Sequence, residues 1–390
     1  MSFLIFFVLW LGTLFGSHYL VYFTTIRSFN ITNVKVKRTL FVAMSVLAVS
    51  FFVSAFLLRL SSNPATNVFS WISSVWYGLL LHLMIAVAVL WLVKLVVVAV
   101  GQTVNMRPVA IGLFVAACLV TTYGVLNSAN VRIRHVDVAI EDLPDRWRGS
   151  TIVQLSDVHL GSIRGISFFE DVVRRANALN PELIVLTGDL FDGMGGDLAS
   201  FVEPLSNLSA NQGVFFVSGN HEGYLGLTEP LSMVERAGIT ILDDEVLDLH
   251  GLQLVGVSFP EFGMLNKRRS VERLGGSLDP SKPTILLYHT PTDVAESSSG
   301  RAEQQSRTYI SPDVDFSFAR DYGIDLQLSG HTHEGQIFPF TYLTKWIFGG
   351  YHYGLHAIGD FRIYISSGTG TWGPPLRTGS RSEIVAIQLH

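Results

Sequence analysis

Residues Thr151-Ile-Val-Gln-Leu-Ser-Asp-Val-His159 decide the fold, because an apolar, β-branched run ends there in a carboxylate and an imidazole. Four later runs have the same form and lead into Gly188-Asp-Leu-Phe-Asp192, Gly219-Asn-His-Glu222, His289 and Gly330-His-Thr-His333. Each run is expected to be a buried strand, which places the polar residues on loops at strand carboxyl ends. Open α/β sheets carry their sites at that edge.

The spacing within the islands predicts how their side chains point. Residues i and i+2 of an extended segment face the same way. Asp157 with His159, and His331 with His333, can therefore each present two ligands to one place. The neighbours Asn220 and His221 should point apart, so that one can bind metal while the other faces substrate.

The ligand types indicate the metal and the chemistry. Imidazole nitrogens mixed with hard oxygens suit manganese, iron or zinc better than calcium, and no thiolate biases the site toward structural zinc. We expect two divalent metal ions, with manganese favoured. Two metals about 3.5–4 Å apart can hold a hydroxide and clamp a phosphoryl oxygen for in-line attack. A lone histidine such as His289 is more often a core or loop residue, but the ordered set of islands predicts a hydrolase site.

This set of islands resembles the calcineurin-like metallophosphoesterase superfamily over roughly residues 149 to 390. The resemblance implies that His221 is the catalytic histidine and that one metal is bound by Asp157, His159, Asp189 and His333. It implies that the second metal is bound by Asp189, Asn220, His289 and His331, so that Asp189 bridges the two. By the same resemblance, Asp192 and Glu222 orient the ligands.

The tail Ser366-Ser-Gly-Thr-Gly-Thr-Trp-Gly-Pro-Pro-Leu-Arg-Thr-Gly-Ser-Arg-Ser-Glu383 is similar to that of a membrane-attached subgroup. That subgroup includes bacterial envelope phosphoesterases, an animal transmembrane protein with a metallophosphoesterase domain, and hydrolases of UDP-2,3-diacylglucosamine. Two departures bear on substrate specificity more than on metal binding. Glu334 stands where a glycine commonly follows Gly-His-Thr-His, and residues of about 296 to 312 look like an insertion.

The first third of the chain predicts a membrane region. No Asp or Glu precedes Asp137, and four apolar stretches approach the roughly 20 residues that span a bilayer: 2–23, 40–58, 72–93 and 109–126. A cleaved signal peptide is the alternative for the first stretch, but it lacks a basic beginning. We expect a transmembrane region over 1–127, a linker and first strand over 128–148, and the phosphoesterase domain over 149–390.

Charge predicts orientation and partners. Arg27, Lys35, Lys37 and Arg38 make the first loop basic, so the positive-inside rule predicts that this loop is cytoplasmic. With four spans the phosphoesterase domain is then extracytoplasmic, in a multi-pass protein of the plasma or inner membrane. The basic residues Arg132 and Arg134, just after the fourth span, oppose this orientation. Nine of the 27 basic residues precede Asp137, so 18 remain against all 32 acids and give the rest a formal charge of −14. Such a domain has no broad field for nucleic acid. The expected partners are the lipid bilayer and a phosphoester substrate.

Strand and helix signals alternate after residue 150, which predicts an α/β fold. We expect helices over 167–179, opened by a capping box at Ser167 and Glu170, and over 197–208 and 228–237. Further strands are expected at 239–242, 246–249, 252–258, 361–366 and 383–389. The resemblance makes the fold specific: a four-layer α-β-β-α metallophosphoesterase sandwich, preceded by a bundle of about four transmembrane helices. The aromatic segment 338–353 is either core or a guide for an acyl chain.

The predicted function is a membrane-anchored, dinuclear metal-dependent phosphoric ester hydrolase of phosphodiesterase or pyrophosphatase type. In this prediction a metal-bound hydroxide attacks a lipid-linked or cell-envelope phosphoester. The alternative is a membrane sensor or scaffold whose phosphoesterase domain binds metal or ligand without turnover. The intact set of ligands and the presence of His221 favour the enzyme.

Overall fold

The computed structural model describes residues 2–194, 196–259, 267–294 and 311–390. The chain forms two compact units. The first contains residues 1–126 together with Gly373–Leu376, and the second contains Asn127–Trp372 together with Arg377–His390. Of the expected insertion at 296–312, only residues 311 and 312 are among those described.

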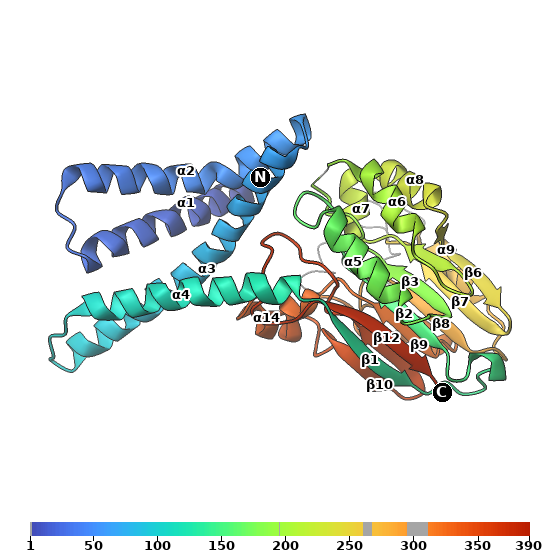
Figure 1. Cartoon of the computed structure of the whole chain (residues 1–390). Helices are drawn as coiled ribbons and strands as arrows, with labels where there is room; N and C mark the ends of the chain where they lie inside the picture. Colours follow the sequence, from blue (N-terminus) through green and yellow to red (C-terminus); the bar gives the residue numbers. More distant parts are fainter. Residues whose placement is uncertain (1, 195, 260–266, 295–310) are drawn as a thin grey trace. The chain divides into compact units, whose positions relative to one another are not determined.

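The first unit consists of long helices: α1 (Ser2–Ser28), α2 (Val34–Leu60), α3 (Pro64–Ala99) and most of α4 (Met106–Ala129) (Figure 1). The side chains of Asn33 and Asn63 cap α2 and α3 by accepting backbone N–H bonds. Among the described residues, α2, α3 and α4 are long and apolar enough to cross a membrane. A helix is present at the first predicted span as well, and its crossing of the membrane stays a prediction.

Buried polar side chains link these helices to one another. The Trp76 indole donates to His18 Nε2 at 3.0 Å, and the Trp91 indole donates to Thr24 Oγ1 at 3.0 Å, which joins α3 to α1. His82 Nδ1 lies 2.8 Å from Thr121 Oγ1, which joins α3 to α4. In an apolar setting each polar group needs such a partner, so the two histidines serve helix packing.

The second unit is built on two sheets, each with six strands among the described residues. The first sheet has the order β1-β12-β2-β3-β4-β5, with β1 (Arg132–Val138), β12 (Glu383–Leu389), β2 (Thr151–Leu155), β3 (Leu183–Thr187), β4 (Val214–Val217) and β5 (Thr240–Ile241). The second has the order β10-β11-β9-β8-β7-β6, with β10 (Gly354–Ile358), β11 (Phe361–Ile365), β9 (Leu326–Ser329), β8 (Thr284–Tyr288), β7 (Leu252–Val257) and β6 (Glu245–Leu249).

Strand direction brings the polar islands to common edges. In the first sheet, β2, β3 and β4 are parallel neighbours, with Gln154 opposite Val185 and Val185 opposite Phe215. In the second sheet, β8 and β9 are parallel neighbours. The loops that follow these strands therefore leave each sheet at one edge, as the sequence predicted.

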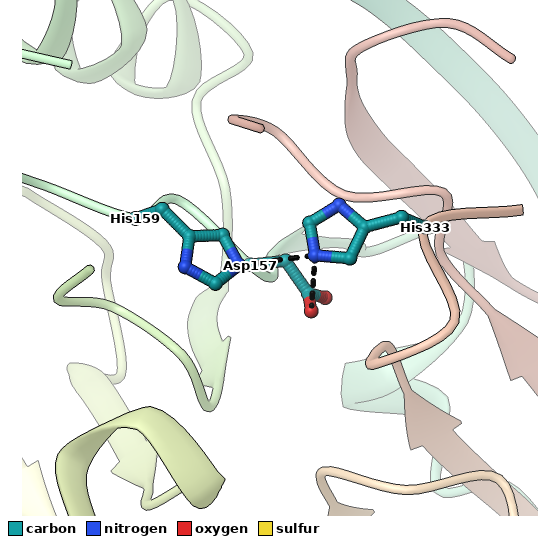
Figure 2. Close-up of side chains that lie close together, drawn as sticks. All are labelled: Asp157, His159 and His333. Carbon is teal, nitrogen blue, oxygen red and sulfur yellow. Dashed lines mark hydrogen bonds and ion pairs between the residues drawn. The ribbon is translucent and has the colours of Figure 1, made fainter. Parts of the chain in front are cut away.

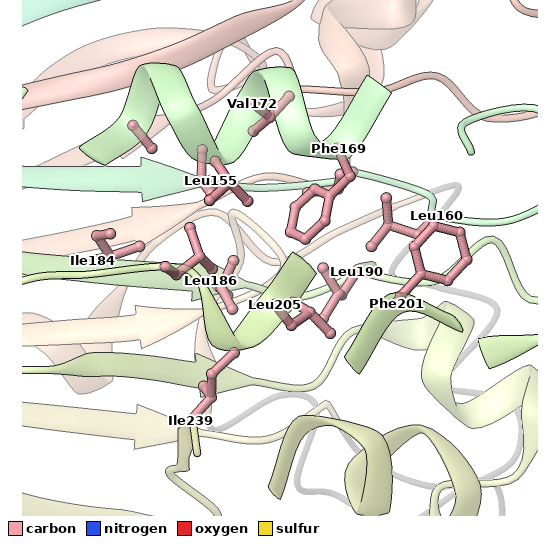
Figure 3. Close-up of a cluster of buried hydrophobic side chains, with 14 of the residues drawn as sticks. Leu155, Leu160, Phe169, Val172, Ile184, Leu186, Leu190, Phe201, Leu205 and Ile239 are labelled. Atoms are coloured by element: carbon pink, nitrogen blue, oxygen red, sulfur yellow. The ribbon is translucent and has the colours of Figure 1, made fainter. Parts of the chain in front are cut away.

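Apolar side chains form three layers of core around the sheets. One cluster lies between the sheets and includes Ile152, Leu254 and Leu326, all buried. A second joins the first sheet to α5 (Ile166–Asn177), α6 (Val202–Ser206) and α8 (Thr228–Arg236) (Figure 3). A third joins the second sheet to α9 (Lys267–Gly275) and α13 (Ser317–Asp321). The expected four-layer α-β-β-α sandwich is confirmed.

Local details differ from the sequence expectations. α5 begins at Ile166 with Gly165 as its N-cap, so Ser167 lies inside the helix and the predicted capping box is wrong. A bridge between Leu160 and Arg164 fixes the chain just before the helix, which explains the earlier start. The expected helix over 197–208 is a 3₁₀ turn, η2 (Leu198–Phe201), followed by α6. The other helices in the described parts of the chain are η1 (Asp145–Trp147), α7 (Asn220–Leu225), η3 (His333–Gly335) and α14 (Phe340–Ile347).

Trp147 offers a test of the sandwich. Its ring is fully buried between the sheets, and its indole donates to the Leu249 carbonyl at 3.0 Å. We expect Trp147→Ala to reduce the free energy of unfolding by about 3–5 kcal/mol. Trp147→Phe should cost less, because a ring remains to fill the space. Thermal unfolding of the purified chain in detergent checks both, and equal midpoints for the two variants would contradict this packing role.

Candidate metal centre

Three side chains from two distant parts of the chain, residues 157–159 and His333, converge at the carboxyl end of β2. His159 Nε2 and His333 Nε2 lie 3.0 Å apart, and His333 Nε2 lies 3.3 Å from Asp157 Oδ1 (Figure 2). All three residues are buried. Their nitrogen and oxygen atoms lie within 4.8 Å of one another, which is compatible with binding one cation.

The backbone conformation at these residues differs from the extended one that the sequence predicted. Asp157, His159, His331 and His333 all have positive φ, between 50° and 69°. The segments are therefore not extended, and the prediction that i and i+2 face one way fails as a geometric argument. Asp157 and His159 do meet, but His331 and His333 turn toward different groups of side chains.

A second group forms around Asp189, at the end of β3. His289 Nε2 lies 3.2 Å from Asp189 Oδ2, and it faces Asn220 Oδ1 at 3.2 Å. His331 Nδ1 lies 3.0 Å from the same Asn220 oxygen and 3.3 Å from His289 Nε2. His289 Nδ1 donates to the Thr187 carbonyl at 2.8 Å, so Nε2 is the ring nitrogen that faces Asp189 and Asn220.

His159, Asp189 and His221 make up an overlapping third group. His159 Nε2 lies 3.9 Å from Asp189 Oδ2, so the first two groups are adjacent. His221 Nε2 lies 4.0 Å from the same oxygen, and its ring stands edge-on to that of His159. His221 Nδ1 must carry its proton, because it lies 2.7 Å from the Asp192 carbonyl. The His221 side chain is partly exposed, whereas those of His159 and His289 are not.

The electrostatics of the two groups suit a cation. Burial raises the pKa of Asp157 and of Asp189, but the neighbouring histidines outweigh burial and hold both values below the usual range. Burial lowers the pKa of His159 well below its usual value, and burial with the charge of His289 lowers that of His331 to about 3. Burial also opposes charge on His289, yet Asp189 raises its pKa to about 9. Ionised Asp157 and Asp189 beside neutral His159 and His331 are in the protonation states that divalent metals need, whereas a metal bound at His289 would displace its proton.

Glu222 and Asp192 belong to none of the candidate metal groups that the described residues form, but they contact the loops and side chains that form them. The buried Glu222 carboxylate accepts the backbone N–H groups of Gly219 at 2.8 Å and of Asp189 and Phe191 at 3.0 Å. It therefore fixes the loop that carries Asp189. Asp192 Oδ1 lies 3.9 Å from His159 Nδ1, which has no hydrogen-bond partner among the described residues. Burial raises the pKa of Asp192 to about 7.

Sequence reasoning missed Arg377, which is fully buried behind His333. Its guanidinium donates to the Ser367 carbonyl at 2.6 Å, the Gly370 carbonyl at 2.8 Å and the His333 carbonyl at 3.3 Å. Arg377 thereby ties the tail from Ser366 to Glu383 to the turn that carries His333. The arginine was visible in the sequence, but nothing in its spacing showed that it would turn inward.

Glu334, which stands where a glycine commonly follows Gly-His-Thr-His, lies close to the candidate centre. Glu334 has φ of 52° and is half-buried, and it belongs to none of the candidate metal groups among the described residues. Burial and the nearby Glu383 raise its pKa to about 7. The Glu383 carboxylate is satisfied by Tyr353, Tyr364 and Ser366.

Comparison with known proteins identifies the family. Residues 150–335 match the family described as calcineurin-like phosphoesterase. The chain is 35% identical over 266 residues to an uncharacterized metallophosphoesterase of Helicobacter pylori strain J99, which covers 67% of this chain and 64% of that protein. It is 31% identical over 303 residues to a transmembrane protein with metallophosphoesterase domain from Danio rerio, covering 73% of this chain and 63% of that protein.

The chain thus spans somewhat less than two thirds of the length of these relatives. Among solved structures, a phosphopantetheinyl hydrolase of Mycobacterium tuberculosis is similar with a TM-score of 0.34 and 14% identity, over 58% of this chain and 91% of that one. The family match, the curated relatives and the converging aspartates and histidines agree. The chain belongs to the calcineurin-like metallophosphoesterases.

Proposed function

We propose that this chain is a membrane-anchored, dinuclear metal-dependent phosphoesterase acting on a lipid-linked or cell-envelope phosphoester. The observation that carries the proposal is the adjacency of two ligand groups, Asp157 with His159 and His333, and Asp189 with His289 and His331. The apolar helices of the first unit support attachment to a bilayer. A sensor without turnover would need the ligands but not His221, whose ring nitrogen faces the centre.

In this proposal Asp189 would be a ligand to both metals. Asp157, His159 and His333 would complete one site, and Asn220, His289 and His331 would complete the other. When bound, two divalent ions polarise the phosphoryl oxygens and lower the pKa of the attacking water. Manganese is the ion that we favour, with iron and zinc as the alternatives.

The role proposed for His221 follows from its tautomer and surroundings. Its Nδ1 proton is held by the Asp192 carbonyl, so Nε2 is the atom that faces the centre. Burial lowers the pKa of His221, but the charge of Asp189 and the bond to Asp192 outweigh burial and raise it. A raised pKa favours a ring that gives a proton at Nε2 to the leaving oxygen or stabilises charge on the phosphoryl group.

Asp189→Asn and His221→Gln should separate metal binding from turnover. Asp189→Asn is expected to weaken both metal sites together. His221→Gln should keep its metal and lower turnover of a chromogenic phosphodiester by about 10²–10⁴-fold, as expected for lost acid catalysis. Metal analysis and kinetics with Mn²⁺ decide this, and the exposed pair Asp197→Asn and His250→Gln are matched controls. Full activity in both test variants would refute the assignment.

Glu222→Gln should reduce metal content although Glu222 is proposed to bind no metal. The amide nitrogen of glutamine would face one of three backbone N–H donors, and a buried donor without an acceptor costs about 1–3 kcal/mol. We expect a lower thermal midpoint and weaker metal retention. Glu182→Gln is the control, because the Glu182 carboxylate accepts the side-chain amides of Asn211 and Gln212 and lies 3.9 Å from the Arg146 guanidinium, but accepts no backbone N–H among the described residues. Unchanged metal content in Glu222→Gln would contradict this positioning role.

The side of the membrane that carries the phosphoesterase is also proposed. Four basic residues, Arg27 at the end of α1 and Lys35, Lys37 and Arg38 at the start of α2, flank the connection between the first two helices. By the positive-inside rule they favour a cytoplasmic first loop and an extracytoplasmic domain. A reporter fused after His390 should therefore behave as extracytoplasmic. Strong activity from a cytoplasmic reporter would reverse the proposed topology, and it would favour a substrate at the cytosolic face.

A further inference from the structure

The helix α14 exposes several large apolar side chains that do not pack into the core of the second unit. Phe340, Leu343 and Trp346 follow one another at a spacing of three residues and are 42%, 47% and 76% exposed. Tyr342 beside them is 69% exposed, and Phe338 just before the helix is 48% exposed. Single exposed apolar residues are ordinary, but a contiguous group of large ones marks an interaction surface.

The inward side of α14 is less apolar than its outward side. Thr341, Thr344 and Ile347 are its half-buried residues, and none of its eight residues is fully buried. A helix that only covered a protein core would show the reverse pattern. The outward residues therefore have a partner other than the core of their own unit. The aromatic segment 338–353 is thus divided, because Phe348, further along, is buried as core.

Trp372 extends this surface. Its backbone N–H donates to Gln336 Oε1 at 3.1 Å and its carbonyl accepts from Gln336 Nε2 at 2.9 Å, while its ring is 52% exposed. The chain then passes directly into Gly373–Leu376, which group with the long apolar helices. We call Phe338, Phe340, Tyr342, Leu343, Trp346 and Trp372 the α14 surface.

We propose that the α14 surface inserts into the interfacial layer of the lipid bilayer, as a second membrane contact besides the spanning helices. Tryptophan and tyrosine favour this layer because one end of each ring system is apolar and the other is polar. Lys345, also exposed, has a long apolar stem that allows its ammonium group to reach the headgroup phosphates. The inference goes beyond the proposed hydrolysis, because it concerns membrane contact and stands whether or not the centre turns over.

The α14 surface is rigidly joined to the candidate metal centre. A Cβ on Gly335 would lie 2.6 Å from the Thr341 backbone, so the turn carrying His333 and the start of α14 are in close contact. Thr332 Oγ1 donates to the His352 carbonyl at 2.6 Å beyond the helix, and the rings of His331 and Phe348 lie 6.3 Å apart. Insertion of this surface would hold the centre at a fixed depth relative to the headgroups.

The test uses site-directed nitroxide labels on the full chain. Cys118 is the only cysteine, so Cys118→Ser gives a background for Tyr342→Cys and Trp346→Cys, with Ile166→Cys at the exposed start of α5 as the matched control. Each labelled protein is placed, one copy per disc, in nanodiscs of zwitterionic phosphatidylcholine. Accessibility of the label to oxygen and to a water-soluble nickel chelate is then compared. Because Tyr342 and Trp346 are largely exposed, neither replacement should disturb folding, and the thermal midpoint checks this.

At positions 342 and 346 we expect high oxygen accessibility with severalfold lower nickel accessibility than at position 166. Nickel accessibility equal to that at position 166 would overturn the proposal. Labels protected from both reagents would overturn it too, because the surface would then be covered by protein. If either cysteine variant unfolds, Leu343→Cys tests the same surface with the same expected result. The readout does not depend on hydrolysis, so a failed activity assay and a failed insertion test remain distinguishable.

Discussion

The burial of two carboxylates, Asp157 and Asp189, at the ends of neighbouring parallel strands is the constraint that the second unit has to satisfy. Isolated buried charges are costly unless they are paired and hydrogen-bonded. The backbone N–H of His331 meets both oxygens of Asp157 at 3.0 Å, and the N–H of His221 meets Asp189 Oδ1 at 2.9 Å. The loops after β9 and β4 are thus drawn to those after β2 and β3. The convergence of the islands follows from this need.

Much of the architecture could be predicted because burial on both faces leaves a clear mark on strand composition. The runs before Asp157, Asp189 and His289 are mostly apolar, and each is a buried strand. The edge strand β10, with its alternating exposure, lacks that mark and was not predicted. The residues to be tested as metal ligands could be selected from the sequence, although their left-handed backbone could not. The local sequence does not indicate a positive φ at an aspartate or histidine, because the tertiary contacts of the surrounding loops impose that conformation.

Arg377 shows a second limit of sequence reasoning. The Arg377 guanidinium donates hydrogen bonds to the carbonyl groups of residues 333, 367, 368 and 370, and these groups come together only when the chain is folded. The same arginine's own carbonyl accepts from the side chain of Asn127, within the last turn of α4. The end of α4 therefore belongs to the hydrogen-bonded frame of the second unit. Long-range networks of this kind depend on tertiary packing and have no periodic signature along the chain.

The distribution of charge links the candidate centre to the membrane. From Asp137 onward the chain has a formal charge of −14, which disfavours phosphate on most of its surface. Metal ions held by Asp157 and Asp189 would supply local attraction for a phosphoryl group. The same acidity means that a basic patch cannot provide broad electrostatic attachment to lipid. Aromatic insertion does not depend on net charge, so the exposed rings along α14 offer an acidic domain a route to a bilayer surface. Because the backbone at the start of α14 lies against the turn at Gly335, that contact would also orient the candidate centre.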